Sequence, residues 1–387
     1  MKKYICFLFI VCVAFPVQAR KSFKKCVANF EAEVQAFREE MENVGLAVVF
    51  VKDNKIVYHN QFGVKNMETR EPLQENTLFR IASISKSFTT TSLMQLVEQG
   101  KVTLDTDVSQ LAGFTIRNPK YPDKVITLEM LLSHTSSIND SQGYYDSLDV
   151  INPEKNPNYA KCYNDYEPGK GYEYCNLNLN LSGSFLEKLS GERFDQYVVK
   201  HILRPLGLYG GYCVDSLDSK KFASLYEYGN GKYTCVDKSA YNPRSEEISR
   251  YVMGRDAILF SPTGGMKLSA LDLAKYMIMH MNYGTTPDGI RIISEASSKN
   301  MQTPRSADEN YGLTLNRMTQ YSPGVELVGH TGGAYGMRSA MYFNPEKKYG
   351  FVMMSNGAHG YASDKKTNII KGVLQRMYKS LVLRDIK

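Results

Sequence analysis

Hydrophobic positions in the N-terminal part of the chain recur first at helical spacing and then in strand-like runs. Over residues 25–43, the spacing of Phe30, Val34 and Phe37 by three to four positions predicts an amphipathic helix. Two apolar runs follow with turn residues between them, which predicts a pair of strands over residues 44–51 and 55–62.

A second helical pattern begins directly after Ser83. The run of residues 77–82 leads into Ser83, residues 84–99 fit a helix, and Gly100 is a natural C-terminal stop. The C-terminal part alternates strands with tight turns, and strands are predicted over residues 325–332, 339–343 and 350–355. A helix is predicted before them over residues 271–281, and a closing helix over residues 368–383.

The middle of the chain is richer in loops, with a hairpin predicted around the Gly229-Asn230-Gly231 turn. Strands and helices from both ends therefore flank a helical, loop-rich segment. We predict an α+β fold, an α/β sandwich in which both chain ends build one antiparallel sheet with helices on its faces. Residues 20–387 would form a single unit, with 20–80 and 256–387 in the sheet part and 81–255 in the helical part.

The first residues resemble a targeting segment. Lys2 and Lys3 precede an apolar run over residues 4–15, which is too short to cross a bilayer as a helix. Small residues follow at Val17-Gln18-Ala19, so we expect residues 1–19 to be a secretory signal peptide cut after Ala19. A buried N-terminal helix is the alternative. We expect an exported protein without a membrane span after cleavage.

Charge and cysteine content add little that is specific. The formal net charge is +7 and no Lys/Arg block stands out, so no nucleic-acid partner is expected. Cys213 and Cys235 flank the predicted hairpin and are the best candidates for a disulfide in an exported chain. The Cys and His spacings match no zinc pattern, so neither a metal nor another cofactor is expected.

Three short motifs, in one order, carry the candidate chemistry: Ser83-Ile84-Ser85-Lys86, Tyr174-Cys175-Asn176 and His330-Thr331-Gly332. No motif is specific alone. S-x-x-K also occurs at Ser22 and Ser363, and Y-x-N also occurs at Tyr58, Tyr228 and Tyr342. Their order and surroundings distinguish the functional set from the chance matches.

Ser83 and Lys86 have the spacing of a nucleophile and its base. At the start of a helix they lie on one face, one turn apart. A serine hydroxyl needs an adjacent base at neutral pH, and a buried lysine with a lowered pKa can serve. A helix cap and a surface lysine are the alternative interpretation of the tetrapeptide alone.

The other two motifs supply substrate contacts. Tyr174 is expected to act as a second base and to protonate the leaving group, while Asn176 hydrogen-bonds a substrate amide. The glycines around His330 and Thr331 allow an extended substrate to pair with this strand. Backbone N–H groups of Ser83 and Gly333 are the expected oxyanion donors, and Gly332 belongs to the same substrate-binding run.

With these residues the chain resembles the serine β-lactamase and penicillin-binding-protein-like superfamily, in its class C and DD-carboxypeptidase branch. The resemblance covers nearly all of residues 30–385. Further segments in the family's order support it: Phe79-Arg80-Ile81-Ala82-Ser83, Leu131-Leu132-Ser133-His134-Thr135-Ser136, Pro205-Leu206-Gly207-Leu208, Gly264-Gly265-Met266 and Gly329-His330-Thr331-Gly332-Gly333.

The resemblance implies a β-lactamase/transpeptidase-like fold with an acylated Ser83, proton transfer shared by Lys86 and Tyr174, and a small-molecule or peptide substrate. Class C β-lactamases usually carry Lys-Thr-Gly where this chain has His330. The expected activity is therefore that of a DD-peptidase or D-amino-acid peptidase, or of an esterase, ahead of a β-lactamase. A penicillin-binding sensor or non-catalytic binding protein on the same fold is the alternative of another class. His134 is expected to be structural.

Overall fold

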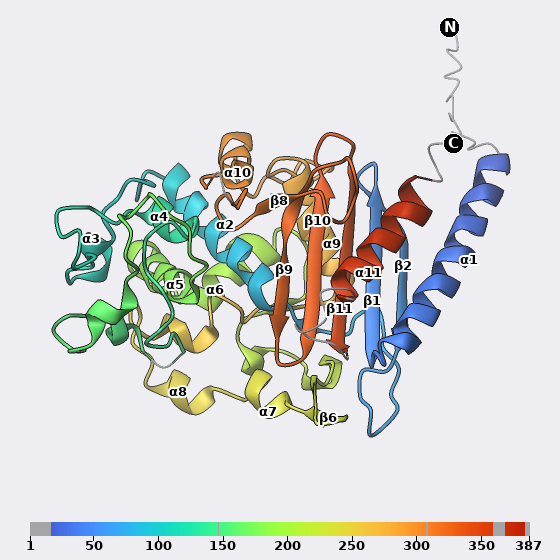
Figure 1. The fold of residues 1–387 in the computed structure, drawn as a ribbon, viewed down its shortest axis with the longest axis horizontal. Helices are drawn as coiled ribbons and strands as arrows, with labels where there is room; N and C mark the ends of the chain where they lie inside the picture. The colour runs from blue at the N-terminus through green and yellow to red at the C-terminus, as the bar shows by residue number, and fades with distance from the viewer. Residues whose placement is uncertain (1–16, 146, 307–308, 359–367, 384–387) are drawn as a thin grey trace, which may run out of the picture.

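A six-stranded antiparallel sheet forms the centre of the computed structural model, in the order β2-β1-β11-β10-β9-β8 (Figure 1). The structure describes residues 17–145, 147–306, 309–358 and 368–383. N-terminal β1 pairs with β11, so both chain ends build the sheet and the predicted α+β class is confirmed. The strands are β1 (Gly45–Lys52), β2 (Lys55–Gly63), β8 (Asn316–Met318), β9 (Leu327–Ala334), β10 (Met337–Asn344) and β11 (Tyr349–Gly357).

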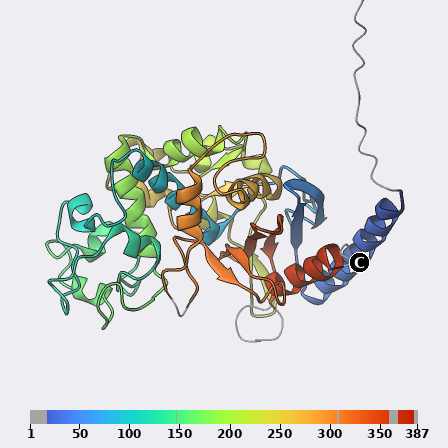
Figure 2. The ribbon, with the colours of Figure 1, turned by 90° about the horizontal axis from the view of Figure 1, so that it is seen from above.

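Side chains of β1 alternate between two hydrophobic layers, as the pleat of a strand requires. Leu46, Val48 and Phe50 pack on the layer that α1 (Val17–Glu40) and α11 (Ile369–Met377) complete. Figure 2 shows these two terminal helices together beside the sheet. Val49 and Val51 face the opposite layer, which is covered by α9 (Ala270–Met281).

The remaining helices lie mainly beyond the β9 side of the sheet, to the left in Figure 1. They are α2 (Ser85–Glu98), α3 (Val108–Ala112), α4 (Leu128–Leu132), α5 (Asn176–Ser190), α6 (Phe194–Val198), α7 (Asp237–Ala240), α8 (Ser245–Ser249) and α10 (Glu295–Gln302). Short strands β3 (Phe79–Arg80), β7 (Lys267–Leu268) and β4 (Gly210–Gly211) form a second sheet, and β5 (Tyr226–Gly229) with β6 (Lys232–Cys235) form the predicted hairpin.

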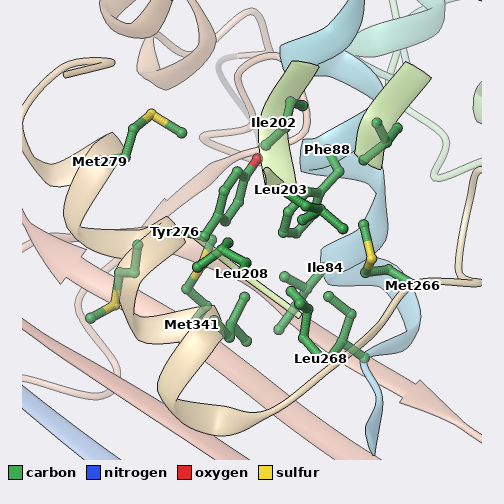
Figure 3. Close-up of a cluster of buried hydrophobic side chains, with 14 of the residues drawn as sticks. Ile84, Phe88, Ile202, Leu203, Leu208, Met266, Leu268, Tyr276, Met279 and Met341 are labelled. Atoms are coloured by element: carbon green, nitrogen blue, oxygen red, sulfur yellow. The ribbon is translucent and has the colours of Figure 1, made fainter. Parts of the chain in front are cut away.

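The start of α2 is held between α9 and the short sheet by buried apolar side chains (Figure 3). The rings of Phe88 and Tyr276 stack with centroids 3.7 Å apart. Ile84, Met266 and Leu268 fill the space beside them, each without exposed area. This packing fixes the helix turn that carries Ser83 relative to the sheet.

The predicted disulfide between Cys213 and Cys235 is wrong. Both are free, as is every cysteine in the described part of the chain. Cys213 is buried in the main hydrophobic core beside β4, whereas Cys235 is exposed at the end of β6, opposite Tyr226. Closeness to one hairpin in sequence did not bring the two side chains together.

Helix α1 starts earlier than predicted. It includes Ala19, the expected last residue of the signal peptide, while residues 1–16 of that segment lie outside the described residues. Cleavage after Ala19 therefore stays a prediction, as do the boundaries of the sheet and helical parts. Within the described ranges, no helix is long and apolar enough to cross a membrane.

Candidate active site

Ser83 lies in a single 3₁₀ turn, η1 (Ala82–Ile84), that leads directly into α2. Ala82 before it has a φ of 46°, a left-handed conformation that non-glycine residues rarely adopt. The turn is held by its flanks, because the Ser85 hydroxyl accepts a hydrogen bond from the Met266 N–H at 3.1 Å and Ser339 donates to the Ile81 carbonyl at 2.9 Å. Packing of this kind maintains local strain at reactive positions.

Lys86 is the centre of the polar network. Its Nζ lies 3.1 Å from the Ser83 hydroxyl, 2.9 Å from Asn176 Oδ1 and 2.9 Å from the Thr263 carbonyl oxygen. The side chain has no exposed area. Burial lowers its pKa to about 7, against an opposing influence of Asp140 and Cys175. The amine can thus be neutral near pH 7, which a general base for Ser83 requires.

Tyr174 packs against this network. The Lys86 Nζ lies 4.8 Å from the centre of its ring, and its hydroxyl is hydrogen-bonded to Ser83. Burial raises the pKa of Tyr174, although the bond to Ser83 acts in the opposite direction. The phenol therefore keeps its proton in this arrangement and is placed to donate it.

Asn176 opens α5 and is held from two sides. Its Oδ1 accepts from the Lys86 Nζ and from the Thr263 hydroxyl at 2.9 Å, while its Nδ2 donates to Asp140 Oδ2 at 2.8 Å. Asp140 also accepts the backbone N–H groups of Asn176 and Leu177, both at 2.9 Å, so it caps the helix. The amide orientation follows from these partners.

His330 lies on β9, beside the Ser83 turn. It is buried, its Nδ1 is 2.5 Å from the Thr331 carbonyl, and its Nε2 is 3.0 Å from the Tyr311 hydroxyl. Because a carbonyl only accepts, Nδ1 carries the proton and Nε2 accepts from Tyr311. Burial, then the Lys86 charge, lowers the pKa of His330 to about 4.

The edge of β9 that faces away from β10 is only partly covered. Strand β8 pairs with residues 327–329, and the run from His330 onward has no strand partner on that side among the described residues. A Cβ added to Gly332 would overlap the Ile81 carbonyl oxygen, which shows how closely β9 approaches the Ser83 turn. Ser83 and Gly333 thus belong to adjoining segments, and their role as oxyanion donors stays a prediction.

Residues 30–374 match the family model described as Beta-lactamase. The chain belongs to the β-lactamase family. This is a family of serine hydrolases, so the family expected from the three motifs is confirmed.

Relatives of the chain include several kinds of protein. Protein flp of Staphylococcus aureus (strain MRSA252) is 24% identical over 316 residues, covering 81% of this chain and 59% of that protein. Penicillin-binding protein 4* of Bacillus subtilis (strain 168) is 24% identical over 328 residues, covering 80% and 67%. The chain thus spans about 59% of the length of the curated relatives first matched.

Solved structures with this fold are similarly diverse. The octameric penicillin-binding protein homologue from Pyrococcus abyssi has a TM-score of 0.72 at 26% identity, over 92% of this chain and 77% of that one. EstCE1, a hydrolase with promiscuous acyltransferase activity, has a TM-score of 0.73 at 20% identity, over 93% and 100%. The D-amino acid amidase from Ochrobactrum anthropi SV3 has a TM-score of 0.70 at 19% identity, over 91% and 98%.

Several residues of this β-lactamase-family site could not be identified from the sequence. Asp140, Thr263 and Tyr311 each bond directly to a predicted site residue. His134, predicted to be structural, packs with its ring 4.5 Å from that of Tyr174, and its Nδ1 accepts the Cys175 N–H at 3.2 Å. Its motif was recognised, but no pattern in the sequence connects it to Tyr174. Within the described residues, no group of His, Cys, Asp and Glu side chains gathers as a metal site.

Proposed function

We propose that this hydrolase works through an acyl-enzyme on Ser83 and cleaves amide or ester bonds. One observation carries the proposal: a buried Lys86 whose Nζ is 3.1 Å from the Ser83 hydroxyl and whose pKa is near 7. A non-catalytic binding protein has no need to keep a buried amine in this state. The intact set of Ser83, Lys86 and Tyr174 is thus best explained by catalysis.

In the acylation step, neutral Lys86 takes the Ser83 proton while the Ser83 oxygen attacks the substrate carbonyl carbon. The negative charge that forms on the carbonyl oxygen is bound by the N–H groups of Ser83 and Gly333. Tyr174 donates its proton to the leaving amine or alcohol and regains one from Lys86. Water then attacks the acyl group and frees Ser83.

The substrate proposal is a D-amino-acid peptide of the cell-wall type, or an ester. Neutral His330 in place of a lysine supports this choice over a β-lactam, since the strand then presents no cation at that position. Among structural neighbours, one is a D-amino acid amidase and another is the hydrolase EstCE1. A class C-type β-lactamase is the second candidate.

Hydrolysis assays distinguish these substrates. The assay uses p-nitrophenyl butyrate, a D-alanine p-nitroanilide and nitrocefin, with the unmodified protein, Ser83→Ala and the exposed-site control Ser249→Ala. We expect turnover of the ester or the D-anilide, lost only in Ser83→Ala. Turnover of nitrocefin alone would indicate a β-lactamase, and activity that survives in Ser83→Ala would contradict the proposal.

We also propose that the protein is exported. The expected product is a mature chain that starts at Arg20, outside the cytoplasm, and N-terminal sequencing of the protein recovered from each cell fraction checks this. An uncut chain confined to the cytoplasm would overturn the proposal.

A further inference from the structure

A cavity of about 260 Å³ lies next to the segments that build the active site. It is lined by parts of the strand before Ser83, the turn before Thr263 and the β9–β10 turn after Gly333. The residues that matter for its chemistry are Arg80, Ser261, Tyr335, Asn242, Arg244 and Lys267. Three of these are basic, and no acidic side chain belongs to the part of the lining that the structure describes.

Arg80 is nine-tenths buried and poorly satisfied. Its Nη atoms make two long hydrogen bonds, 3.3 Å to the Ala240 carbonyl and 3.4 Å to the Ser261 hydroxyl. Its Nε has no hydrogen-bond partner. In the described ranges no carboxylate forms an ion pair with Arg80, and its guanidinium lies 5.1 Å from the Tyr335 ring centre. A buried guanidinium with a free donor is costly unless an anion completes it.

Lys267 presents a buried amine to the same cavity. It is 3% exposed, and its Nζ donates to the Tyr212 carbonyl at 2.7 Å. The nearby Asp215 carboxylate accepts the backbone N–H of Arg244 at 2.7 Å. The Arg244 side chain is about one-third exposed and reaches Glu247 at 3.0 Å. Burial and the neighbouring arginines lower the pKa of Lys267, an effect that a bound anion would reverse.

We propose that this cavity binds a carboxylate group, held by the Arg80 guanidinium and Lys267, with Arg244 on its more exposed side. A planar guanidinium matches a carboxylate in a two-bond arrangement. The volume lies below the usual range for drug-sized ligands, so the anion is small. The carboxylate comes either from the acyl part of the substrate or from a separate small acid. The first source rests on the function proposed above, and the second does not.

Binding is tested without catalysis, in the Ser83→Ala protein. Glutarate is titrated at constant ionic strength, and affinity is followed by calorimetry and by the thermal midpoint. We expect saturable binding that weakens about tenfold or more in Arg244→Gln and in Lys267→Met. Arg250→Gln is the matched control, because it removes an ion pair at the other end of α8, with Glu246, and does not line the cavity. No saturable binding, or equal weakening in the control, would overturn the site.

Hydrolysis then identifies the source of the carboxylate. The unmodified protein and Arg244→Gln are compared on p-nitrophenyl butyrate and on the mono-p-nitrophenyl ester of glutaric acid. If Arg244→Gln lowers kcat/KM about tenfold more for the anionic ester than for p-nitrophenyl butyrate, mainly by raising KM, the carboxylate belongs to the substrate. Glutarate binding without this difference assigns it to a separate acid. If neither ester nor the D-alanine p-nitroanilide is hydrolysed, the proposed function fails while the binding result still decides the site.

Discussion

The Oδ2 atom of Asp140 accepts two hydrogen bonds from Asn176, one from its backbone N–H at 2.9 Å and one from its side-chain amide at 2.8 Å. Because Nδ2 is engaged there, Oδ1 is directed to the Lys86 Nζ. A carboxylate that does not bond Ser83 thus sets the geometry of the base. It also raises the pKa of Lys86, against the larger effect of burial.

Asp140→Asn should act on both stability and pH dependence. The asparagine side chain has one acceptor oxygen where Asp140 has two, so one backbone N–H at the start of α5 loses its acceptor. This loss costs about 1–3 kcal/mol in the free energy of unfolding, measured by urea denaturation. Loss of the negative charge lowers the pKa of Lys86, so the acidic limb of kcat/KM moves to lower pH. A purely structural role would reduce stability and leave the limb where it is.

Lys86 sets the pH dependence of the unmodified enzyme. Only its neutral form accepts the Ser83 proton, so kcat/KM should rise with pH and level off above about pH 7. A rise of kcat/KM centred near pH 10 would mean that Lys86 has its ordinary pKa and is not the base.

Lys86→Met separates activity from stability. We expect kcat to fall by about 10²–10⁴-fold. The thermal midpoint should stay equal or rise, since a buried amine is replaced by an apolar side chain of similar length while Thr263 still bonds Asn176. A large drop in the midpoint would show that the amine has a net stabilising role.

Tyr311→Phe removes the donor to His330 Nε2 and leaves a buried acceptor unpaired. We expect a loss of about 1–3 kcal/mol in unfolding free energy. Tyr172→Phe is the control, because its ring packs 5.6 Å from that of Tyr311 in the same cluster. Equal losses in the two variants would argue against the hydrogen bond between Tyr311 and His330.

Gly332→Ala should push β9 away from the Ser83 turn, because the new Cβ overlaps the Ile81 carbonyl oxygen and the Ser339 hydroxyl. The expected cost is about 1–3 kcal/mol of stability together with lost activity. Gly333→Ala should cost less stability, since its Cβ would lie 3.2 Å from the end of the Arg338 side chain. The reverse order in urea unfolding would refute this account of the strand's position.

Much of the fold was predictable because short stretches of sequence specify its helices and strands. The strand pair at the N-terminus, the helix after Ser83 with its stop at Gly100, and the three C-terminal strands all occur near their expected residues. The prediction that both chain ends build one antiparallel sheet is confirmed by the pairing of β1 with β11.

The missed features depend on contacts between residues far apart in sequence. Asp140 reaches Asn176, Tyr311 reaches His330, and Arg80 meets Lys267 at one cavity, and no local pattern marks these partners. For the same reason, proximity to one hairpin was a poor guide to a disulfide. The burial that lowers the pKa of Lys86 likewise comes from elements assembled around it.

The most direct test of the account is intact-protein mass spectrometry after rapid acid quench of p-nitrophenyl butyrate turnover. We predict an adduct of one butyryl group, located on the peptide that contains Ser83 and absent in Ser83→Ala. Repeating the experiment with a penicillin distinguishes a lasting adduct, as for a penicillin-binding peptidase, from a transient one. An adduct on another residue, or one that persists in Ser83→Ala, would contradict the acyl-enzyme on Ser83.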